Sequence, residues 1–501
     1  MAKTYRIHPG IGIARIGNSP DAMFLAAETP DGLPADFSAG QTSAFSGYKD
    51  ANGFLKRQGA RFRVFEYDTG PGGQDIVREI TAAEANIEWR VQIANTKSAA
   101  NALADVGGFL RPLGPPRNPD ANRADLAITP VLPPIAGVNG SQLEAPSGQF
   151  RGRPVKIAEL KTDVEGRLVV LGGHGTSAAH PVATPINSFA NNPDWFDDVG
   201  DGSVDAVVTF PGQAPLDVEF GSWVIIAPPD FAPGVKGLAS LFDVALSAAA
   251  EASWPPPAPS YQNDILPILQ RAIDLRWVQR YGSWNSFPKD FALLGTIGGQ
   301  ADAARLQAYN KLINVQQGRV LNNFNYTRLQ QHNLIAWRDG QFIADYDPAP
   351  PPAAPGPAAL DRAALEPCVG GGWYPGIESG VLMTNPQIYS EFCRLGRAAF
   401  ADAGEQVVPR PGYLTERMAC PWQADFWECS GSWWPAQRPD KLFTGFPPAH
   451  TGQDWADGIQ DHEDLVANFW KLGLATPGGT GPDGLPAYFE TERDPSMPRA
   501  V

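Results

Sequence analysis

The spacing of the apolar residues changes at a proline-rich break, residues 255–259. Before this break, short runs rich in β-branched residues are separated by turn sequences such as Asp31-Gly32 and Asn139-Gly140. Short runs of this kind between turn signals are typical of strands joined in an antiparallel order. The pattern predicts strands at residues 11–16, 61–67, 166–171, 204–210 and 222–227, in a sandwich-like arrangement.

After the break the apolar residues recur at helical spacing. In residues 261–281 the side chains of Ile265, Leu269, Ile273 and Trp277 are four apart, which predicts one apolar face of a helix. Pro267 falls near its beginning, where proline either kinks a helix or delays its start.

These patterns predict an α+β protein. We expect a β-rich, sandwich-like region over residues 1–254 and a helical region over residues 260–346. A proline-rich connector follows at residues 347–359, and a mixed, largely helical and loop-rich catalytic region occupies residues 360–501. With 501 residues, 43% of them hydrophobic, the chain is long enough to bury a substantial core.

The charge of the chain disfavours two classes of partner. The formal net charge is -15 and the isoelectric point is near 4.9, so neither nucleic acid nor an anionic membrane surface is an expected partner. The first residues lack the apolar core of a signal peptide, so the expected compartment is the cytoplasm. The four cysteines include no CxxC pair, which disfavours a structural zinc site.

Two loops contain residues that can bind metals. His174 and His180 lie six apart in a glycine-rich loop, but this spacing is not helical and no third ligand is evident, so hydrogen-bonded histidines are the preferred interpretation. The acidic run at residues 195–202 lacks the pattern of an EF-hand, so a solvated acidic turn is preferred there. We expect no bound metal.

Familiar nucleotide and hydrolase motifs are missing from the sequence. It contains no GxSxG elbow and no complete GxGxxG fingerprint. Cys368 opens a glycine-rich turn without the lysine of a phosphate-binding loop, and aromatic residues and Glu378 follow it, which suggests a pocket wall. Residues 461–473 predict an amphipathic helix that carries Trp470, whose ordinary role would be to anchor that helix in the core.

Reactive and aromatic side chains are concentrated in residues 419–440, which contain two cysteines and four tryptophans. Asp425 precedes Cys429 by four residues, one turn of a helix. A carboxylate in that position can accept the proton of a thiol.

Several motifs together resemble the LodA/GoxA-like family, the lysine ε-oxidase and glycine oxidase group, over nearly the whole chain. The motifs are IHPGIGIARIGNS (residues 7–19), WFDDVGDG (195–202), CVGGGWYPGIE (368–378), CPWQADFWEC (420–429), WWPAQRPD (433–440) and FWKLG (469–473). Proteins of this family are amino-acid oxidases that use a cysteine tryptophylquinone made from their own side chains. This chain is shorter than familiar members, which leaves its substrate and oligomer contacts open.

The resemblance implies a role for particular residues. Cys429 matches the cross-linked cysteine, and Asp425 matches the acid that assists cofactor formation. We match the tryptophan partner to Trp470, with Trp433 or Trp434 as alternatives, because a bond to Trp433 would close only a small ring. Cys368 would then line the pocket near the quinone.

The implied reaction is oxidative deamination of an amino acid by dioxygen, giving an aldehyde or oxo acid, ammonia and hydrogen peroxide. The candidates for the catalytic base are His462, His450 and Asp425. The resemblance also implies maturation by a separate flavoprotein, and we expect a homo-oligomer. Two alternatives remain open: a non-enzymatic family member that binds a small molecule or peptide through residues 368–378, and a metal hydrolase that uses His174 and His180.

Overall fold

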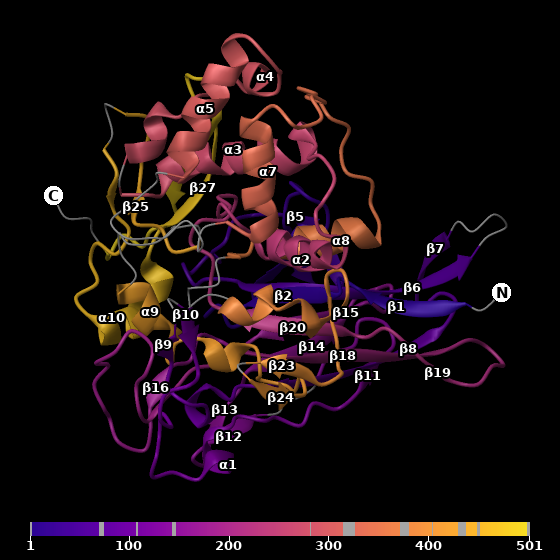
Figure 1. Cartoon of the computed structure of the whole chain (residues 1–501). Helices are drawn as coiled ribbons and strands as arrows, with labels where there is room; N and C mark the ends of the chain where they lie inside the picture. The colour runs from indigo at the N-terminus through magenta and orange to yellow at the C-terminus, as the bar shows by residue number, and fades with distance from the viewer. Residues whose placement is uncertain are drawn as a thin grey trace.

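The structure is a computed structural model. It describes residues 3–69, 75–106, 109–142, 147–280, 282–313, 326–370, 380–402, 404–428, 437–447 and 451–497. One large sheet forms the lower half of the view in Figure 1, and the helices α2, α3, α5, α7 and α8 lie above it. The α+β prediction is confirmed.

Four adjacent strands form the centre of the sheet, in the order β18 (Gly200–Thr209), β20 (Ser222–Ala227), β2 (Ile11–Arg15) and β6 (Arg57–Thr69). Every residue of β2 and of β20 is buried, because both faces of the sheet are covered there. The two strands run parallel, with Ile13 opposite Ile225. The expectation of a purely antiparallel region is therefore wrong at this pair, since strands so far apart in sequence are not restricted to hairpin pairing.

The other strands extend the sheet on both sides. The sheet also contains β1 (Thr4–His8), β3 (Met23–Leu25), β4 (Ala35–Ser38), β5 (Gln41–Ala44), β7 (Asp75–Ile80), β8 (Asn86–Ala94), β11 (Ile135–Ala136), β14 (Ala158–Thr162), β15 (Leu168–Gly172) and β19 (Leu216–Asp217). Each of the five predicted strands overlaps an observed strand: β2, β6, β15, β18 and β20.

Pairs of short antiparallel strands lie outside the large sheet. They are β9 (Ala104–Val106) with β10 (Phe109–Arg111), β12 (Gly148–Phe150) with β13 (Arg153–Val155), β16 (Ala178–Ala179) with β17 (Trp195–Phe196), β21 (Tyr389–Glu391) with β22 (Arg394–Leu395), β23 (Phe400–Asp402) with β24 (Glu405–Val407), β25 (Lys441–Leu442) with β26 (Gln453–Asp454), and β27 (Leu474–Thr480) with β28 (Pro486–Thr491).

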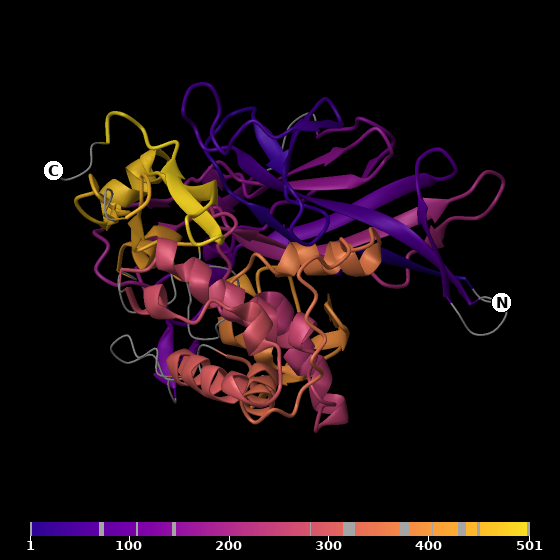
Figure 2. The same ribbon diagram turned by 90° about the horizontal axis from the view of Figure 1, so that it is seen from above.

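The helical layer begins with α2 (Leu241–Ala250), whose first turn is closed by a capping box between Ser240 and Asp243. The predicted helix at residues 261–281 starts as a π-helical turn and becomes α3 (Leu266–Asp274) with Pro267 in its first turn, where proline is tolerated. The remaining helices of this layer are α4 (Phe291–Leu294), α5 (Gln300–Ile313), α7 (Arg328–Arg338) and α8 (Pro357–Leu365), and α1 (Arg123–Leu126) lies apart from them. Figure 2 shows the helices gathered along one side of the sheet.

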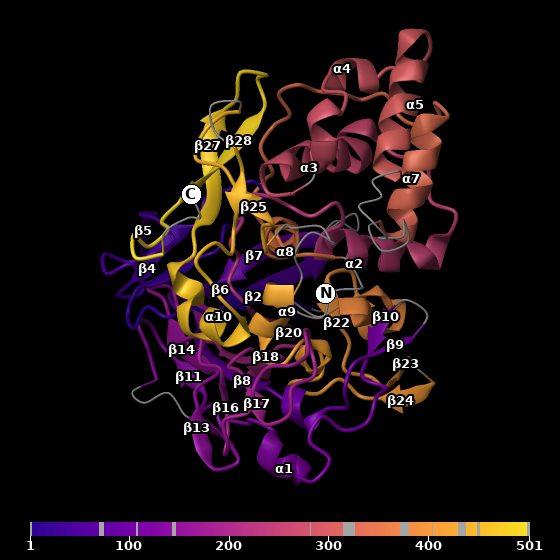
Figure 3. The ribbon, with the colours of Figure 1, turned by 90° about the vertical axis from the view of Figure 1, so that its left-hand side faces the viewer.

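Two short helices from the C-terminal part lie against the sheet's edge. They are α9 (Trp422–Glu428) and α10 (His462–Asn468), which pack side by side below the β27–β28 hairpin in Figure 3. The helix predicted at residues 461–473 is therefore present, with Asp461 as its N-cap and a 3-10 turn at its end. Among the described residues, no helix has the length and apolar character needed to cross a membrane.

Residues from both sides of the proline break share one apolar core. Phe62 from the sheet, Leu269 from α3 and Trp422 from α9 belong to the same buried cluster. α9, which carries Asp425, is therefore part of the same continuous core as the sheet. The four region boundaries stay a prediction.

Candidate functional site

Asp425 lies in the middle of α9 and is completely excluded from solvent. The rings of Trp422 and Phe426 on the same helix are 4.8 Å apart, and Phe426 also contacts Phe231 and Trp455. The helix that carries Asp425 is therefore packed into the aromatic part of the core.

A buried ion pair holds the beginning of α9. The backbone N–H of Trp422 donates to Asp197 Oδ2 at 3.0 Å, and Lys97 Nζ lies 2.5 Å from the same oxygen. Neither side chain of the pair is exposed to solvent. Lys97 also donates to the carbonyl of Ala419 at 2.7 Å, so the pair fixes both the helix and the chain that enters it.

The acidic run at residues 195–202 is therefore structural, and its interpretation as a solvated turn is wrong. Asp197, Asp198 and Asp201 are all fully buried. Asp201 accepts hydrogen bonds from the Thr415 hydroxyl at 2.6 Å and from the Trp223 indole at 2.9 Å. Burial raises the pKa of Asp201 to about 6 and that of Asp198 to about 7.

His462 lies at the C-terminal end of α9. Its Nε2 is 2.9 Å from Glu428 Oε1, and its ring centroid is 6.1 Å from that of Trp427. Glu428 is the last residue of α9 and directly precedes Cys429, which lies outside the described residues. His462, one of the predicted candidates for the base, thus contacts the last residue of α9, whereas His450 lies outside the described residues.

Trp470 lies at the opposite end of the helix pair. Its neighbour Phe469 packs on Trp422, the first residue of α9, with ring centroids 5.4 Å apart. Six residues of helix separate Trp422 from Glu428, a rise of about 9 Å. The partly exposed indole of Trp470 packs on Phe54, 5.0 Å away between ring centroids, rather than on α9. The predicted bond between Trp470 and Cys429 stays a prediction, because Cys429 lies outside the described residues.

The chain returns to α9 immediately after Trp433 and Trp434, which are themselves outside the described residues. Arg438 Nε donates to the carbonyl of Phe426 at 2.6 Å. The side-chain amide of Gln437 donates to the carbonyl of Pro367 at 2.7 Å, next to Cys368. Gln437 and Arg438 therefore connect this part of the chain to Pro367 and to α9.

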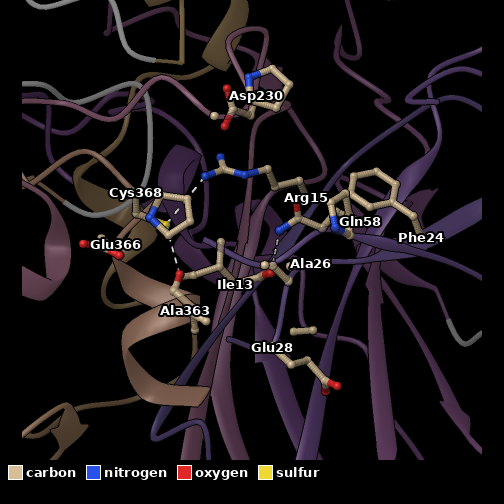
Figure 4. A pocket seen from close by; sticks show the side chains of 18 of the residues that line it. Ile13, Arg15, Phe24, Ala26, Glu28, Gln58, Asp230, Ala363, Glu366 and Cys368 are labelled. Carbon is tan, nitrogen blue, oxygen red and sulfur yellow. Dashed lines mark hydrogen bonds between the residues drawn. The ribbon is translucent and has the colours of Figure 1, made fainter. Parts of the chain in front are cut away.

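Cys368 is buried three residues after the end of α8, on the wall of a cavity of about 380 Å³. Its Sγ lies 3.6 Å from Arg15 Nη2 and 3.5 Å from the Ala364 carbonyl oxygen. Figure 4 shows Cys368, Arg15 and Asp230 together at one side of this cavity. The turn after Cys368, including Glu378, lies outside the described residues.

Sequence reasoning missed the supporting residues of this site. Lys97 and Asp230 lie in none of the quoted motifs, and only the fold brings them to α9 and to the cavity beside Cys368. Gln437 lies within the motif of residues 433–440, but the motif does not show that it contacts Pro367. Arg15 and Asp197 do lie within the quoted motifs of residues 7–19 and 195–202, which was the available signal.

The described residues contain no group of three or more side chains suited to a metal ion. His174 is partly buried in its loop, and burial lowers its pKa. The backbone N–H of Thr176, in the same loop, donates to Asp198 at 2.9 Å, so this loop braces the acidic segment.

Two family models match the chain. The model described as L-Lysine epsilon oxidase N-terminal matches residues 8–226, and the model described as L-lysine epsilon oxidase C-terminal domain matches residues 310–446. The second match includes Cys368, Asp425, Cys429 and both Trp433 and Trp434, whereas Trp470 lies beyond its end.

The chain is similar to a characterised protein over almost its full length. It is 24% identical to the L-lysine 6-oxidase of Marinomonas mediterranea in an alignment of 664 positions that covers 97% of this chain and 89% of the relative. The alignment is longer than this chain, so the relative carries insertions.

The fold is similar to solved structures of the L-Lys epsilon-oxidase from Marinomonas mediterranea. One, at 22% identity, has a TM-score of 0.77 and covers 98% of this chain and 95% of the other. A second, of the Schiff base intermediate with L-Lys, has the same TM-score at 23% identity and the same coverage of both chains.

Proposed function

Because this chain belongs to the L-lysine ε-oxidase (LodA) family and is an amino-acid oxidase, we propose that it uses a cysteine tryptophylquinone formed from Cys429. The reaction is oxidation of a primary amine of an amino acid by dioxygen, giving an aldehyde or oxo acid, ammonia and hydrogen peroxide. The observation that carries the proposal is the complete burial of Asp425 in α9, four residues before Cys429 in the sequence.

The residues around α9 fit such a cofactor. A thiol, nearby tryptophans and a buried carboxylate are the groups needed to make a thioether on an oxidised indole. When formed, the quinone supplies an electrophilic carbonyl and an acceptor for two electrons.

We propose that Trp433 or Trp434, rather than Trp470, completes the cofactor. Trp433 and Trp434 lie between Glu428, the last residue of α9, and Arg438, which donates to the carbonyl of Phe426 in the same helix, and this supports the proposal. Trp470 packs on Phe54 at the other end of the α9–α10 pair. A bond from Cys429 to Trp433 or Trp434 would close a small ring of the chain. That ring would itself restrict the indole, so no second helix is needed to hold it.

Three side chains have proposed roles beside the cofactor. Asp425 accepts the thiol proton while the thioether forms. His462, held by Glu428 at the same end of α9, removes the proton from the substrate carbon. Cys368 forms part of the wall of the substrate cavity.

Maturation requires an oxidant that acts on Trp and Cys side chains, and we propose that a separate flavoprotein supplies it. The protein produced without this partner should be colourless, with the mass of the unmodified chain. The protein produced with it should absorb visible light and release peroxide.

The test is a peroxide-release screen over amino acids, with intact mass and visible absorption measured on the same preparation. Peroxide release that depends on the flavoprotein and accompanies a mass increase supports the proposal. An oxidase with the unmodified mass would contradict the cofactor, and a matured, coloured protein that binds amino acids without releasing peroxide would contradict the reaction.

A further inference from the structure

A second, smaller cavity lies within the helical layer. It is lined by residues of the helices α2, α3, α7 and α8, which lie close together in Figure 1, and by the π-helical turn at Tyr261–Ile265. Its volume is about 40 Å³. One water needs roughly 10–15 Å³ of such space, so the cavity has room for an ion or a few waters and for nothing larger.

Most of the charged side chains on this cavity neutralise one another. Four of them form ion pairs among themselves: Asp243, Arg271, Arg362 and Glu366. Lys236, which is not part of the lining, lies 3.1 Å from Glu366 and is shared with Asp31, 2.8 Å away. These groups leave no net charge for a ligand.

Asp264, in the π-helical turn, is the acid that they do not neutralise. Its Oδ2 accepts the backbone N–H of Ser260 at 2.8 Å, and it forms no ion pair with any other described residue. Burial raises the pKa of Asp264, and the nearby acids Asp345 and Asp243 raise it further. A partly buried carboxylate in such surroundings is stabilised by a cation.

Asn333 on α7 lines the same cavity and is only 5% exposed. In the part of the chain that the structure describes, its side-chain amide forms no hydrogen bond. Buried amides are almost always hydrogen-bonded, so an amide without a protein partner on the wall of a polar cavity points to a ligand. Its oxygen is of the kind that binds hard cations.

We propose that Asp264 and Asn333 bind a small monovalent cation in this cavity. One carboxylate without a cationic partner matches a single positive charge, and carboxylate and amide oxygens suit a hard cation. A divalent metal fits less well, because the described residues contain no group of three or more His, Cys, Asp or Glu side chains that could hold one. The cation joins the π-helical turn to α7, and it stabilises the helical layer whether or not the quinone is formed.

The test is urea unfolding of the full-length protein at constant ionic strength. Choline chloride is the reference salt, because its cation is larger than the cavity, and it is replaced in steps by sodium, potassium or ammonium chloride. At least one of these three cations should stabilise the protein in a saturable way. At ten times the dissociation constant, the folding equilibrium constant should rise about 11-fold.

Two variants remove the proposed ligands. Asp264→Asn removes the charge but can still accept the N–H of Ser260, and Asn333→Leu removes the amide at nearly the same volume. Both should lose the gain that the cation gives. Asp345→Asn is the matched control, since Asp345 lies close to Asp264 but does not line the cavity, and this variant should keep most of the gain.

Sodium-23 NMR gives a second measurement that does not depend on unfolding. The sodium signal should broaden with the unaltered protein, and the broadening should be lost with Asp264→Asn or, if that variant does not fold, with Asn333→Leu. Identical stability in all four salts together with no broadening would overturn the inference. A cation effect that persists in both variants would overturn it as well, because the cation would then bind elsewhere.

Discussion

Lys97 and Asp197 form an ion pair that is entirely excluded from solvent, and the Asp197 oxygen that lies 2.5 Å from Lys97 Nζ also accepts the backbone N–H of Trp422. Trp422 is the first residue of α9. This ion pair and hydrogen bond join three segments of the chain: the 3-10 helix η1 (Lys97–Ala99), the end of strand β17 at Phe196, and α9, which carries Asp425. The position of Asp425 therefore depends on a charge pair far from it in the sequence.

Lys97→Met should destabilise the fold by about 3–5 kcal/mol, because it leaves Asp197 as a buried, uncompensated charge. Urea unfolding followed by tryptophan fluorescence measures the loss. Arg328→Gln is the control, since Arg328 is paired with Glu251 at the surface and its loss should cost less than about 1 kcal/mol. Equal costs for the two variants would remove the structural role given to the buried pair.

Asp425→Asn should fold and yet contain no quinone, because the amide keeps the shape of the carboxyl group but cannot accept the thiol proton. Intact mass and visible absorption after production with the flavoprotein measure the outcome. Glu428→Gln changes an exposed acid on the same helix and should mature normally. A normal quinone content in Asp425→Asn would show that this carboxylate is dispensable for maturation.

His462→Asn should mature normally and lose about 100-fold or more in kcat, because a positioned base contributes on that order. Steady-state peroxide release, normalised to quinone content, measures the effect. A kcat within about twofold of the unaltered enzyme would exclude His462 as the base.

Asp198 should make stability depend on pH. Its pKa in the folded protein is raised to about 7 by burial, whereas the unfolded value is about 3.9. The folded state therefore binds the proton more tightly, and the contribution of this group to stability is lost as the pH rises from about 4 through 7. In Asp198→Asn the side chain stays neutral at every pH. The free energy of unfolding of this variant, measured in urea and compared with that of the unaltered protein, should therefore rise between pH 4 and pH 8. A constant difference would contradict this assignment.

The sequence was informative where the signal is local. The strands at β2 and β20, the late start of α3 at Pro267 and the helix after Asp461 all follow from short-range patterns. The parallel pairing of β2 with β20 does not, because it depends on how distant strands meet in the sheet.

The same limit applies to the candidate site. The four-residue spacing of Asp425 and Cys429 can be read from the sequence, whereas the position of Trp470 relative to α9 depends on how α9 and α10 are oriented. No local pattern encodes that orientation. The cavity wall formed by Arg15, Asp230 and Cys368 likewise joins three segments that only the fold brings together.

Tryptic peptide mapping of the matured protein tests the central claim most directly. Cleavage places Cys429, Trp433 and Trp434 in one peptide, residues 418–441, because Pro439 blocks cleavage after Arg438, while Trp470 falls in residues 442–471. We predict that the peptide of residues 418–441 carries the whole modification: the oxygens of the quinone are gained and hydrogens are lost through oxidation and cross-linking. An unmodified Cys429 in active enzyme would contradict the quinone, and a cross-link between the two peptides at Trp470 would contradict the assignment to Trp433 or Trp434.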